Sequence, residues 1–187
     1  KVLIMTDQDH DGSHIKGLVI NLFDHLWPQL LDSNFICSML TPIIKAYKGK
    51  KSKSFYTIQD YEKWREKLNN HTWKIKYYKG LGTSTTKEAK QYFKDLKIVN
   101  YTREENDNVS LNLTDSEFLI QKKLNIQKCR IDLAFNKKRA NDRKKWLYDY
   151  DRNIILDSNK SAVTYKEFID KELIHFSNAS NDRSIPD

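Results

Sequence analysis

The chain begins with the run Val2-Leu3-Ile4-Met5-Thr6, which leads directly into Asp7-Gln8-Asp9-His10-Asp11-Gly12-Ser13. A short, continuous aliphatic run of this kind is typical of a strand buried on both faces of a parallel sheet. The three carboxylates then lie at the carboxyl end of that strand, where open α/β sheets carry their chemistry. Two carboxylates about 4 Å apart repel by roughly 4 kcal/mol at an effective dielectric of about 20. A divalent cation is the simplest partner for such a cluster.

A helix is expected to follow the acidic residues. Ser13 is a candidate N-cap, and apolar residues then recur at helical spacing, namely Ile15, Leu18, Val19, Leu22 and Leu26. Gly12 is therefore expected to turn a strand into a helix, with the acids at the turn.

Three kinds of site fit three alternating acids. A calcium loop of the EF-hand type needs a glutamate at its twelfth position, which counted from Asp7 is Leu18. A phosphatase or phosphomutase site would use the first aspartate after the strand as a nucleophile, with magnesium bound by the others. A magnesium site for phosphodiester chemistry would hold two ions about 3.5 to 4 Å apart. The glutamate count argues against the calcium loop and leaves the other two.

Composition indicates a globular chain of one domain, or one domain and part of another. Its 187 residues are 39% hydrophobic and 12% aromatic, which is enough to build a core. No apolar run approaches the ~20 residues of a membrane span, and the start has no signal-peptide pattern. Cys37 and Cys129 are isolated from each other, which favours a reducing, intracellular compartment.

The net charge of +8 is concentrated in the middle of the sequence. Residues 1–44 carry two lysines and five aspartates, and residues 45–103 carry 16 basic and five acidic residues. Residues 104–187 carry 15 of each. A basic block in a chain with an acidic metal-type site indicates a polyanion that lies on the basic surface and presents a phosphate to the metal.

A second strand, turn and helix lie inside this basic block. Residues 73–79 alternate, so that Trp73, Ile75 and Tyr77 are expected on a buried face and Lys74, Lys76 and Tyr78 on a basic outer face. The turn Lys79-Gly80-Leu81-Gly82-Thr83-Ser84 follows, and Thr85 with Glu88 predicts a capping box. Two glycines at a helix start allow backbone N–H groups to approach a phosphate. The spacing matches neither a Walker A loop nor a dinucleotide fingerprint.

The sequence patterns of the remaining segments are less specific. Strands are expected on both sides of Pro42 and at 55–58, with a lysine-rich turn at 49–53 and a short helix at 60–68. Residues 101–117 resemble a surface insertion, and a long helix is expected from 117 to 149. That helix carries a second basic patch of Lys137, Lys138, Arg139, Arg143, Lys144 and Lys145. A linker is expected at 151–163, before a final amphipathic helix that contains Tyr165 and Phe176.

Two of these segments carry a family resemblance. The stretches Met5–Gly17 and Tyr77–Thr85 closely resemble the TOPRIM region of eukaryotic-type DNA topoisomerase II. Asp142–Trp146 and Phe168–Ser177 resemble later segments of the same family, so the resemblance spans nearly the whole chain.

The resemblance implies an α/β fold with a TOPRIM, Rossmann-like parallel sheet flanked by helices, a mixed α+β extension and the start of a winged-helix region. It places a TOPRIM domain without its first strand, and with its basic extension, at 1–100. An acidic insertion and a basic helical segment follow at 101–155, and the linker and winged-helix start occupy 156–187.

For the site, the resemblance implies magnesium ligands and DNA contacts. Asp7 would bridge two Mg²⁺ ions, Asp9 would bind the second, and Asp11 would be a further ligand or an orienting acid; Mn²⁺ or Ca²⁺ can substitute. The expected DNA-binding residues are Lys79, Gly80, Leu81, Gly82, Arg143, Lys144, Lys74, Lys76 and His14, although for His14 a role in capping the helix is favoured over a contact with the phosphate.

The family's catalytic tyrosine and one metal-binding glutamate have no match here. The tyrosine follows an arginine, and the sequence contains no Arg-Tyr pair; the glutamate belongs to a Glu-Gly-Asp-Ser-Ala motif that is also absent. The resemblance therefore implies a central fragment, inactive alone, of an ATP-dependent, homodimeric, nuclear enzyme that acts on double-stranded DNA, with no membrane partner. A DNA-binding module whose acids are only structural remains the alternative.

Overall fold

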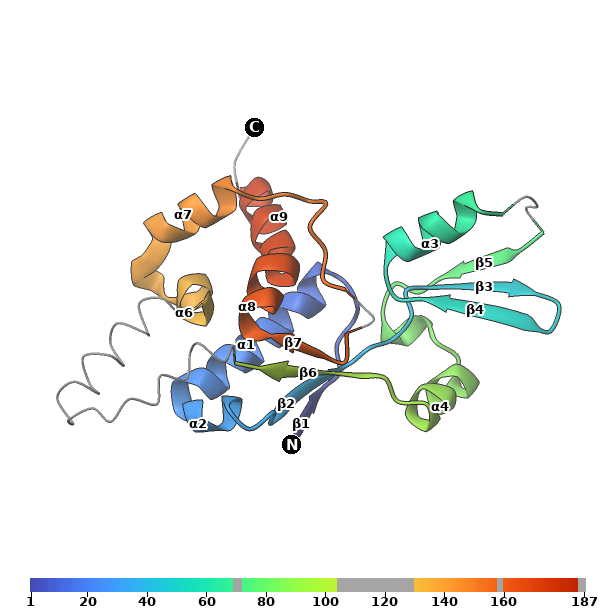
Figure 1. Ribbon diagram of the computed structural model, residues 1–187, viewed down its shortest axis with the longest axis horizontal. Helices are drawn as coiled ribbons and strands as arrows, with labels where there is room; N and C mark the ends of the chain where they lie inside the picture. Colours follow the sequence, from blue (N-terminus) through green and yellow to red (C-terminus); the bar gives the residue numbers. More distant parts are fainter. Residues whose placement is uncertain (69–71, 104–129, 158–159, 185–187) are drawn as a thin grey trace.

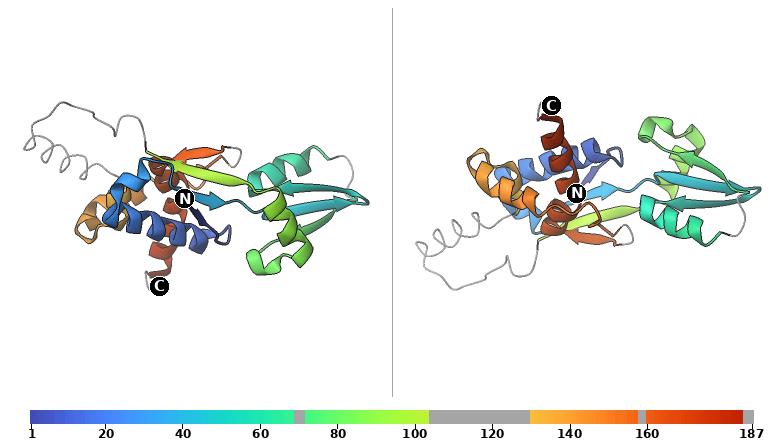
Figure 2. Two further views of the ribbon diagram at one scale, coloured as in Figure 1. Left: turned by 90° about the horizontal axis from the view of Figure 1, so that it is seen from below. Right: turned by 90° about the horizontal axis from the view of Figure 1, so that it is seen from above.

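The computed structural model describes residues 1–68, 72–103, 130–157 and 160–184. Figure 1 shows two lobes, each built on its own sheet. The large lobe comprises residues 1–40 and the described residues from 97 to 184, and the small lobe comprises the described residues of 43–95. Both views of Figure 2 show the lobes side by side along the long axis of the molecule.

The large lobe contains a four-stranded sheet in the order β1-β2-β6-β7. Its strands are β1 (Val2–Ile4), β2 (Ile36–Met39), β6 (Ile98–Thr102) and β7 (Ala162–Thr164). β1 and β2 are parallel, as are β6 and β7, but β2 and β6 are antiparallel. The prediction of a parallel sheet is therefore wrong for the central pair.

The reason lies in the chain path between β2 and β6. The chain leaves β2 at Met39, forms the small lobe and returns at Ile98, the residue that pairs with Met39. A strand that re-enters a sheet at the end where its neighbour left must run in the opposite direction. The small lobe is thus an excursion from one end of the large sheet.

Helix α1 (His10–Leu26) begins earlier than the sequence predicts. Its N-cap is Asp9, whose carboxylate accepts a hydrogen bond of 2.7 Å from the Gly12 N–H, so the prediction of Ser13 as N-cap is wrong. Gly12 consequently lies inside the first turn of the helix. An aspartate at this position satisfies one of the free N–H groups of the helix start.

The buried face of α1 is small and partly polar. It consists of Gly12, Ser13, Lys16, Gly17 and Ile20. The apolar residues whose spacing predicted the helix are instead half exposed: Ile15, Leu18, Leu22 and Leu26, each at 46–49%. Helical spacing therefore identified the helix but not the face that packs on the sheet.

The C-terminal residues complete the same core. After α2 (Pro28–Leu31) the other described helices of the large lobe are α6 (Arg130–Phe135), the 3₁₀ turn η3 (Lys137–Arg139), α7 (Ala140–Tyr148), α8 (Tyr165–Phe168), the π-helical turn η4 (Ile169–Leu173) and α9 (Ile174–Ser184). Phe168, Ile169 and Leu173 are almost completely buried in one cluster with Ile20 and Ile36. The linker predicted for 151–163 runs into β7. The predicted domain boundary after residue 155 stays a prediction.

The long helix predicted for 117–149 is interrupted where it can be described. Asn136 separates α6 from α7 because its backbone is extended and its side chain accepts a hydrogen bond of 2.9 Å from the Lys138 N–H. Residues 117–129 of that prediction lie outside the described residues, as do 104–117 of the predicted insertion.

The small lobe is an antiparallel sheet in the order β4-β3-β5. It consists of β3 (Ile44–Lys48), β4 (Lys51–Phe55) and β5 (Lys74–Tyr77), with α3 (Ile58–Glu66), the 3₁₀ turn η1 (Leu81–Thr83) and α4 (Thr86–Lys94). Lys48 pairs with Lys51, so the lysine-rich turn is only Gly49-Lys50. Its core is Ile44, Ala46, Phe55 and Tyr61.

Helices α3 and α4 lie on opposite sides of this small sheet (Figure 2). The prediction that Tyr77 is buried and Tyr78 lies on an outer face is wrong: Tyr77 is 58% exposed, and Tyr78 is 8% exposed. The face expected to be open is covered by α4, which supplies a polar partner for Tyr78.

No helix in the described part of the chain is long and apolar enough to cross a membrane.

Candidate functional site

Two loops, one from each lobe, meet at the junction between the lobes. We call residues 7–11, which lead from β1 into the first turn of α1, the acidic loop, and residues 79–84, after β5, the glycine turn. A Cβ atom placed on Gly80 would lie 2.6 Å from Oδ2 of Asp7. Gly80 also has a φ of +118°, a conformation that L side chains rarely adopt. The backbone of the turn therefore lies directly against the Asp7 carboxylate, with no side chain between them.

A second glycine encloses Asp7 from its other side. A Cβ atom on Gly12 would lie 1.9 Å from the backbone oxygen of Asp7, which leaves no space for any other residue. At Gly82, by contrast, a Cβ atom would meet nothing within 4 Å. The position of Asp7 thus depends on Gly80 and Gly12 and not on Gly82.

The three predicted metal ligands lie in this loop but do not form a closed cluster. Asp7 is half-buried, Asp9 caps α1 through one carboxylate oxygen, and Asp11 is exposed in the first turn. Among the described residues, no three His, Cys, Asp or Glu side chains are grouped so that they could hold a metal ion. Carboxylate oxygens suit Mg²⁺, but these three alone do not complete a site. Their metal role stays a prediction.

The start of α1 is fixed to the C-terminal helices through a buried ion pair. Lys16 is only 4% exposed, and its ammonium group contacts a carboxylate oxygen of Glu172 in η4. The Ser13 hydroxyl donates to the same oxygen at 2.8 Å. Removal of one partner would leave a buried charge uncompensated, which is strongly destabilising. The start of α1, which contains the end of the acidic loop, is thereby held in place.

His14 is also part of this contact between α1 and the C-terminal helices. Its ring stacks on Phe176 of α9, with ring centroids 4.0 Å apart. The N-cap position is occupied by Asp9, so the alternative that His14 caps the helix is wrong. A contact of His14 with DNA stays a prediction.

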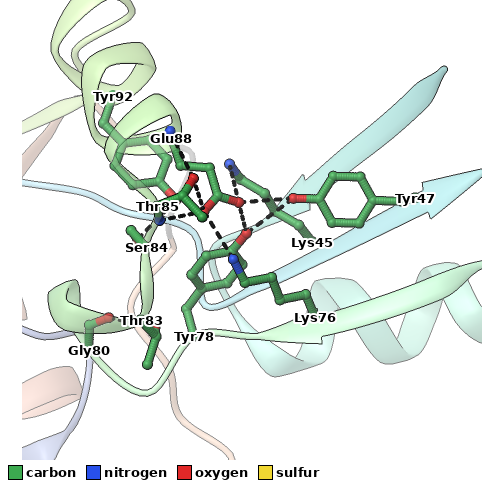
Figure 3. Close-up of polar contacts among 10 residues, drawn as sticks. All are labelled: Lys45, Tyr47, Lys76, Tyr78, Gly80, Thr83, Ser84, Thr85, Glu88 and Tyr92. Carbon is green, nitrogen blue, oxygen red and sulfur yellow. Dashed lines mark hydrogen bonds and ion pairs between the residues drawn. The ribbon is translucent and has the colours of Figure 1, made fainter.

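The glycine turn is connected to the small sheet through the carboxylate of Glu88 (Figure 3). Oε1 accepts hydrogen bonds from the hydroxyls of Tyr47, at 3.1 Å, and Tyr78. Oε2 accepts from the Thr85 N–H at 2.8 Å, the Thr85 hydroxyl at 2.9 Å and the Lys76 ammonium at 3.0 Å. The capping box of Thr85 and Glu88 is confirmed. The other contacts of Glu88 were not predicted, because they join residues far apart in the sequence.

These contacts determine the protonation states of the Glu88 carboxyl and the Tyr78 hydroxyl. Burial raises the pKa of Glu88, but the hydrogen bonds from Tyr78, Thr85 and Lys76 outweigh burial and hold that pKa well below its usual range. Burial, and then the hydrogen bond to Glu88, raises the pKa of Tyr78 well above its usual range. Glu88 is therefore an ionised acceptor and Tyr78 a neutral donor at physiological pH.

The predicted DNA-binding residues fall into two separate groups. Lys79 and Gly82 are exposed in the glycine turn, Lys74 is exposed at the opposite end of β5, and Lys76 is paired with Glu88. The side chain of Leu81 lies outside the described residues.

Helix α7 carries the second group. Lys144 is exposed there, but Arg143 donates hydrogen bonds to the backbone oxygens of Leu133 and Asn136 and so caps α6. Figures 1 and 2 place α7 at the end of the large lobe away from the small lobe. The structure therefore does not bring Arg143 and Lys144 together with the glycine turn.

Comparisons with known proteins agree on one family. A family model described as the C-terminal associated domain of TOPRIM matches residues 39–123 and 98–181. Over 203 aligned residues that include the whole chain, the sequence is 44% identical to DNA topoisomerase 2-beta of Gallus gallus and 43% identical to DNA topoisomerase 2-alpha of Homo sapiens. The chain covers 11% and 12% of these two proteins.

A solved structure shows the same fold. The crystal structure of the Plasmodium falciparum topoisomerase II DNA-binding, cleavage and re-ligation domain superimposes with a TM-score of 0.81 at 43% identity. The match covers 99% of this chain and 23% of that one. This chain therefore belongs to the eukaryotic DNA topoisomerase II family, in the region associated with TOPRIM.

The close approach of Gly80 to Asp7 can be tested by substitution. Gly80→Ala forces a side chain into an unfavourable φ and onto the Asp7 carboxylate, so we expect it to lower the free energy of unfolding by about 1–3 kcal/mol. Gly82→Ala, in the same turn, should change it by no more than about 0.5 kcal/mol because the space is open. Urea unfolding followed by circular dichroism measures both, and equal effects would contradict the described geometry.

Proposed function

We propose that this chain is a central segment of a type II DNA topoisomerase, in which it contributes Mg²⁺ ligands and DNA backbone contacts to transient cleavage and re-ligation of duplex DNA. The observation that carries the proposal is the meeting of the Asp7 carboxylate with the Gly80 backbone. An acidic loop and a glycine turn that touch can serve one phosphate, the first through a cation and the second through N–H groups. The family membership supports the same reading.

In this proposal the residues have separate roles. Asp7, Asp9 and Asp11 would be the chain's contribution to the binding of Mg²⁺, which neutralises negative charge on a reacting phosphate. Lys79 would pair with the DNA backbone, and the backbone of Gly80, Leu81 and Gly82 would lie along it. The nucleophile and the remaining metal ligand would come from other parts of the enzyme.

We extend the proposal to the whole enzyme on the basis of the family alone. Such an enzyme would use ATP, work as a homodimer on double-stranded DNA and reside in the nucleus. This chain would then be inactive by itself.

A DNA-binding module without a catalytic role is the second candidate function. The observation that favours it is the use of Asp9 as an N-cap, since a carboxylate that caps a helix has a structural reason to be there. The two candidates predict different consequences for the loss of Asp7, which has no capping role.

Asp7→Ala in the complete enzyme distinguishes them. If Asp7 binds the cation, the substitution should abolish DNA cleavage and leave the dissociation constant for DNA within about twofold. Cleavage of a supercoiled plasmid and fluorescence anisotropy with a labelled duplex measure the two properties. The matched control is Asp95→Ala, at the exposed end of α4, which should cleave normally. Normal cleavage by Asp7→Ala would support the non-catalytic module.

The phosphate contacts can be counted from the salt dependence of DNA binding. Each phosphate neutralised by a lysine contributes about 0.9 to the slope of log affinity against log salt concentration. Lys79→Ala and Lys74→Ala should each reduce the slope by roughly this amount. Lys76→Ala should reduce it less because Lys76 is already paired with Glu88, and Lys63→Ala, on exposed α3, should leave it unchanged. An unchanged slope for Lys79→Ala would contradict a phosphate contact at the glycine turn.

A further inference from the structure

Both ends of the glycine turn are bound to one carboxylate. Tyr78 directly precedes the turn, and its hydroxyl donates to Oε1 of Glu88. Thr85 directly follows the turn, and both its N–H and its hydroxyl donate to Oε2. Glu88 therefore closes residues 79–84 into a loop with a fixed base (Figure 3).

The same carboxylate is connected to the sheet of the small lobe. Tyr47 of β3 donates to it at 3.1 Å and Lys76 of β5 at 3.0 Å, while the ammonium group of Lys45 lies 4.0 Å from Oε1. Lys45 is itself buried, and its ammonium group lies 4.7 Å from the ring centroid of Tyr92 on α4. A capping box needs only Thr85 and Glu88, so the contacts from β3 and β5 exceed what capping requires.

These contacts determine where the tip of the turn lies. Within the turn, the Thr83 hydroxyl and N–H donate to the Gly80 oxygen at 2.8 and 3.3 Å, which keeps the tip compact. At its base, the Tyr78 N–H donates to the Ile43 oxygen at 2.8 Å, next to the bonds to Glu88. If Tyr78 and Thr85 at the base moved, the compact tip would therefore move with them, and Gly80 would be displaced from Asp7.

We propose that Glu88 is a positioning residue of the cleavage reaction, which holds the glycine turn at the distance from Asp7 that the reacting phosphate requires. The proposal rests on the proposed function. Glu88 does not touch the phosphate; it acts through Tyr78 and Thr85, and Tyr47 and Lys76 fix it to the sheet.

Glu88→Gln is a sharp test because of the hydrogen-bond chemistry. The carboxylate offers only acceptors, whereas an amide keeps one acceptor oxygen and places an NH₂ group against donors. In either orientation of the amide, its NH₂ group faces the donor groups of Tyr78 or of Thr85, at one of the two ends of the glycine turn. The substitution therefore disturbs the base of the turn with almost no change of volume.

The main experiment measures DNA cleavage by the complete enzyme at saturating DNA and Mg²⁺. Misplacement of a group by about 1 Å can reduce a rate about 100-fold, so Glu88→Gln and Tyr78→Phe should lower the cleavage rate by about 10- to 100-fold. The dissociation constant for DNA should stay near that of the controls. The midpoint of thermal unfolding should do so as well in Tyr78→Phe, which leaves every charge around Glu88 in place. The controls are Glu62→Gln on exposed α3 and Tyr148→Phe, at a tyrosine that is 90% exposed.

A purely structural role gives a different pattern. In that case the cleavage rate, the DNA affinity and the thermal midpoint would fall together, and this outcome would overturn the proposal. Unchanged cleavage by both variants would overturn it as well.

Tyr47→Phe gives a milder variant if the others do not fold. It removes one hydroxyl bonded to Glu88 and leaves both ends of the turn attached. In the ¹⁵N-labelled 187-residue chain, the amide signals of Gly80 and Gly82 should shift in Tyr47→Phe and stay in place in Glu62→Gln. If the glycine signals of Tyr47→Phe coincide with those of the unmodified chain, the contact between β3 and Glu88 does not fix the turn, and the proposed link of Glu88 to the sheet fails.

Asp7→Ala in the same cleavage assay separates this proposal from the proposed function. If Asp7→Ala cleaves DNA normally, the proposed function fails, and the glycine signals still decide whether Glu88 positions the turn. If Asp7→Ala abolishes cleavage and Glu88→Gln cleaves normally, only the positioning role fails.

Discussion

The approach of the Gly80 backbone to the Asp7 carboxylate is the constraint on which the arrangement of the two lobes depends. Asp7 follows a strand of the large sheet, and Gly80 follows a strand of the small sheet. A side chain at Gly80 would meet the carboxylate at 2.6 Å, and one at Gly12 would meet the Asp7 backbone at 1.9 Å. A side chain at Gly80 would therefore push the glycine turn and the Asp7 carboxylate apart at the junction of the lobes, and one at Gly12 would displace the acidic loop within the large lobe.

Two carboxylates hold the two sides of this contact. Glu172 pairs with the buried Lys16 and accepts from Ser13, which fixes the helix that follows the acidic loop. Glu88 binds both ends of the glycine turn. A largely buried carboxylate is stable only when ionic and hydrogen-bonding partners surround it, so each network tolerates little displacement. The two loops therefore meet between two networks that hold their flanking residues.

The sequence predicted the features that depend on neighbouring residues, such as β1, the capping box of Thr85 and Glu88 and the helix after the acids. It missed one local signal, since Asp9 rather than Ser13 caps α1 by accepting a hydrogen bond from the Gly12 N–H three residues on. Its other failures arise where distant residues decide. Lys16 is buried although its charge predicts exposure, and Ile15 and Leu18 are half exposed although apolar spacing marks them equally. The direction of β6 and the burial of Tyr78 likewise depend on where the chain returns and on what α4 covers.

The central claim is that the acidic loop and the glycine turn form one site for a divalent cation and a phosphate. Paramagnetic relaxation by Mn²⁺ in the complete enzyme, ¹⁵N-labelled in this segment and with a short duplex present, tests it most directly, because broadening depends steeply on distance from the ion. The amide signals of Asp7 to Asp11 and of Gly80 to Gly82 should broaden together at the lowest Mn²⁺ concentrations. Broadening of the acidic loop without the glycine turn, or of neither segment, would contradict the claim.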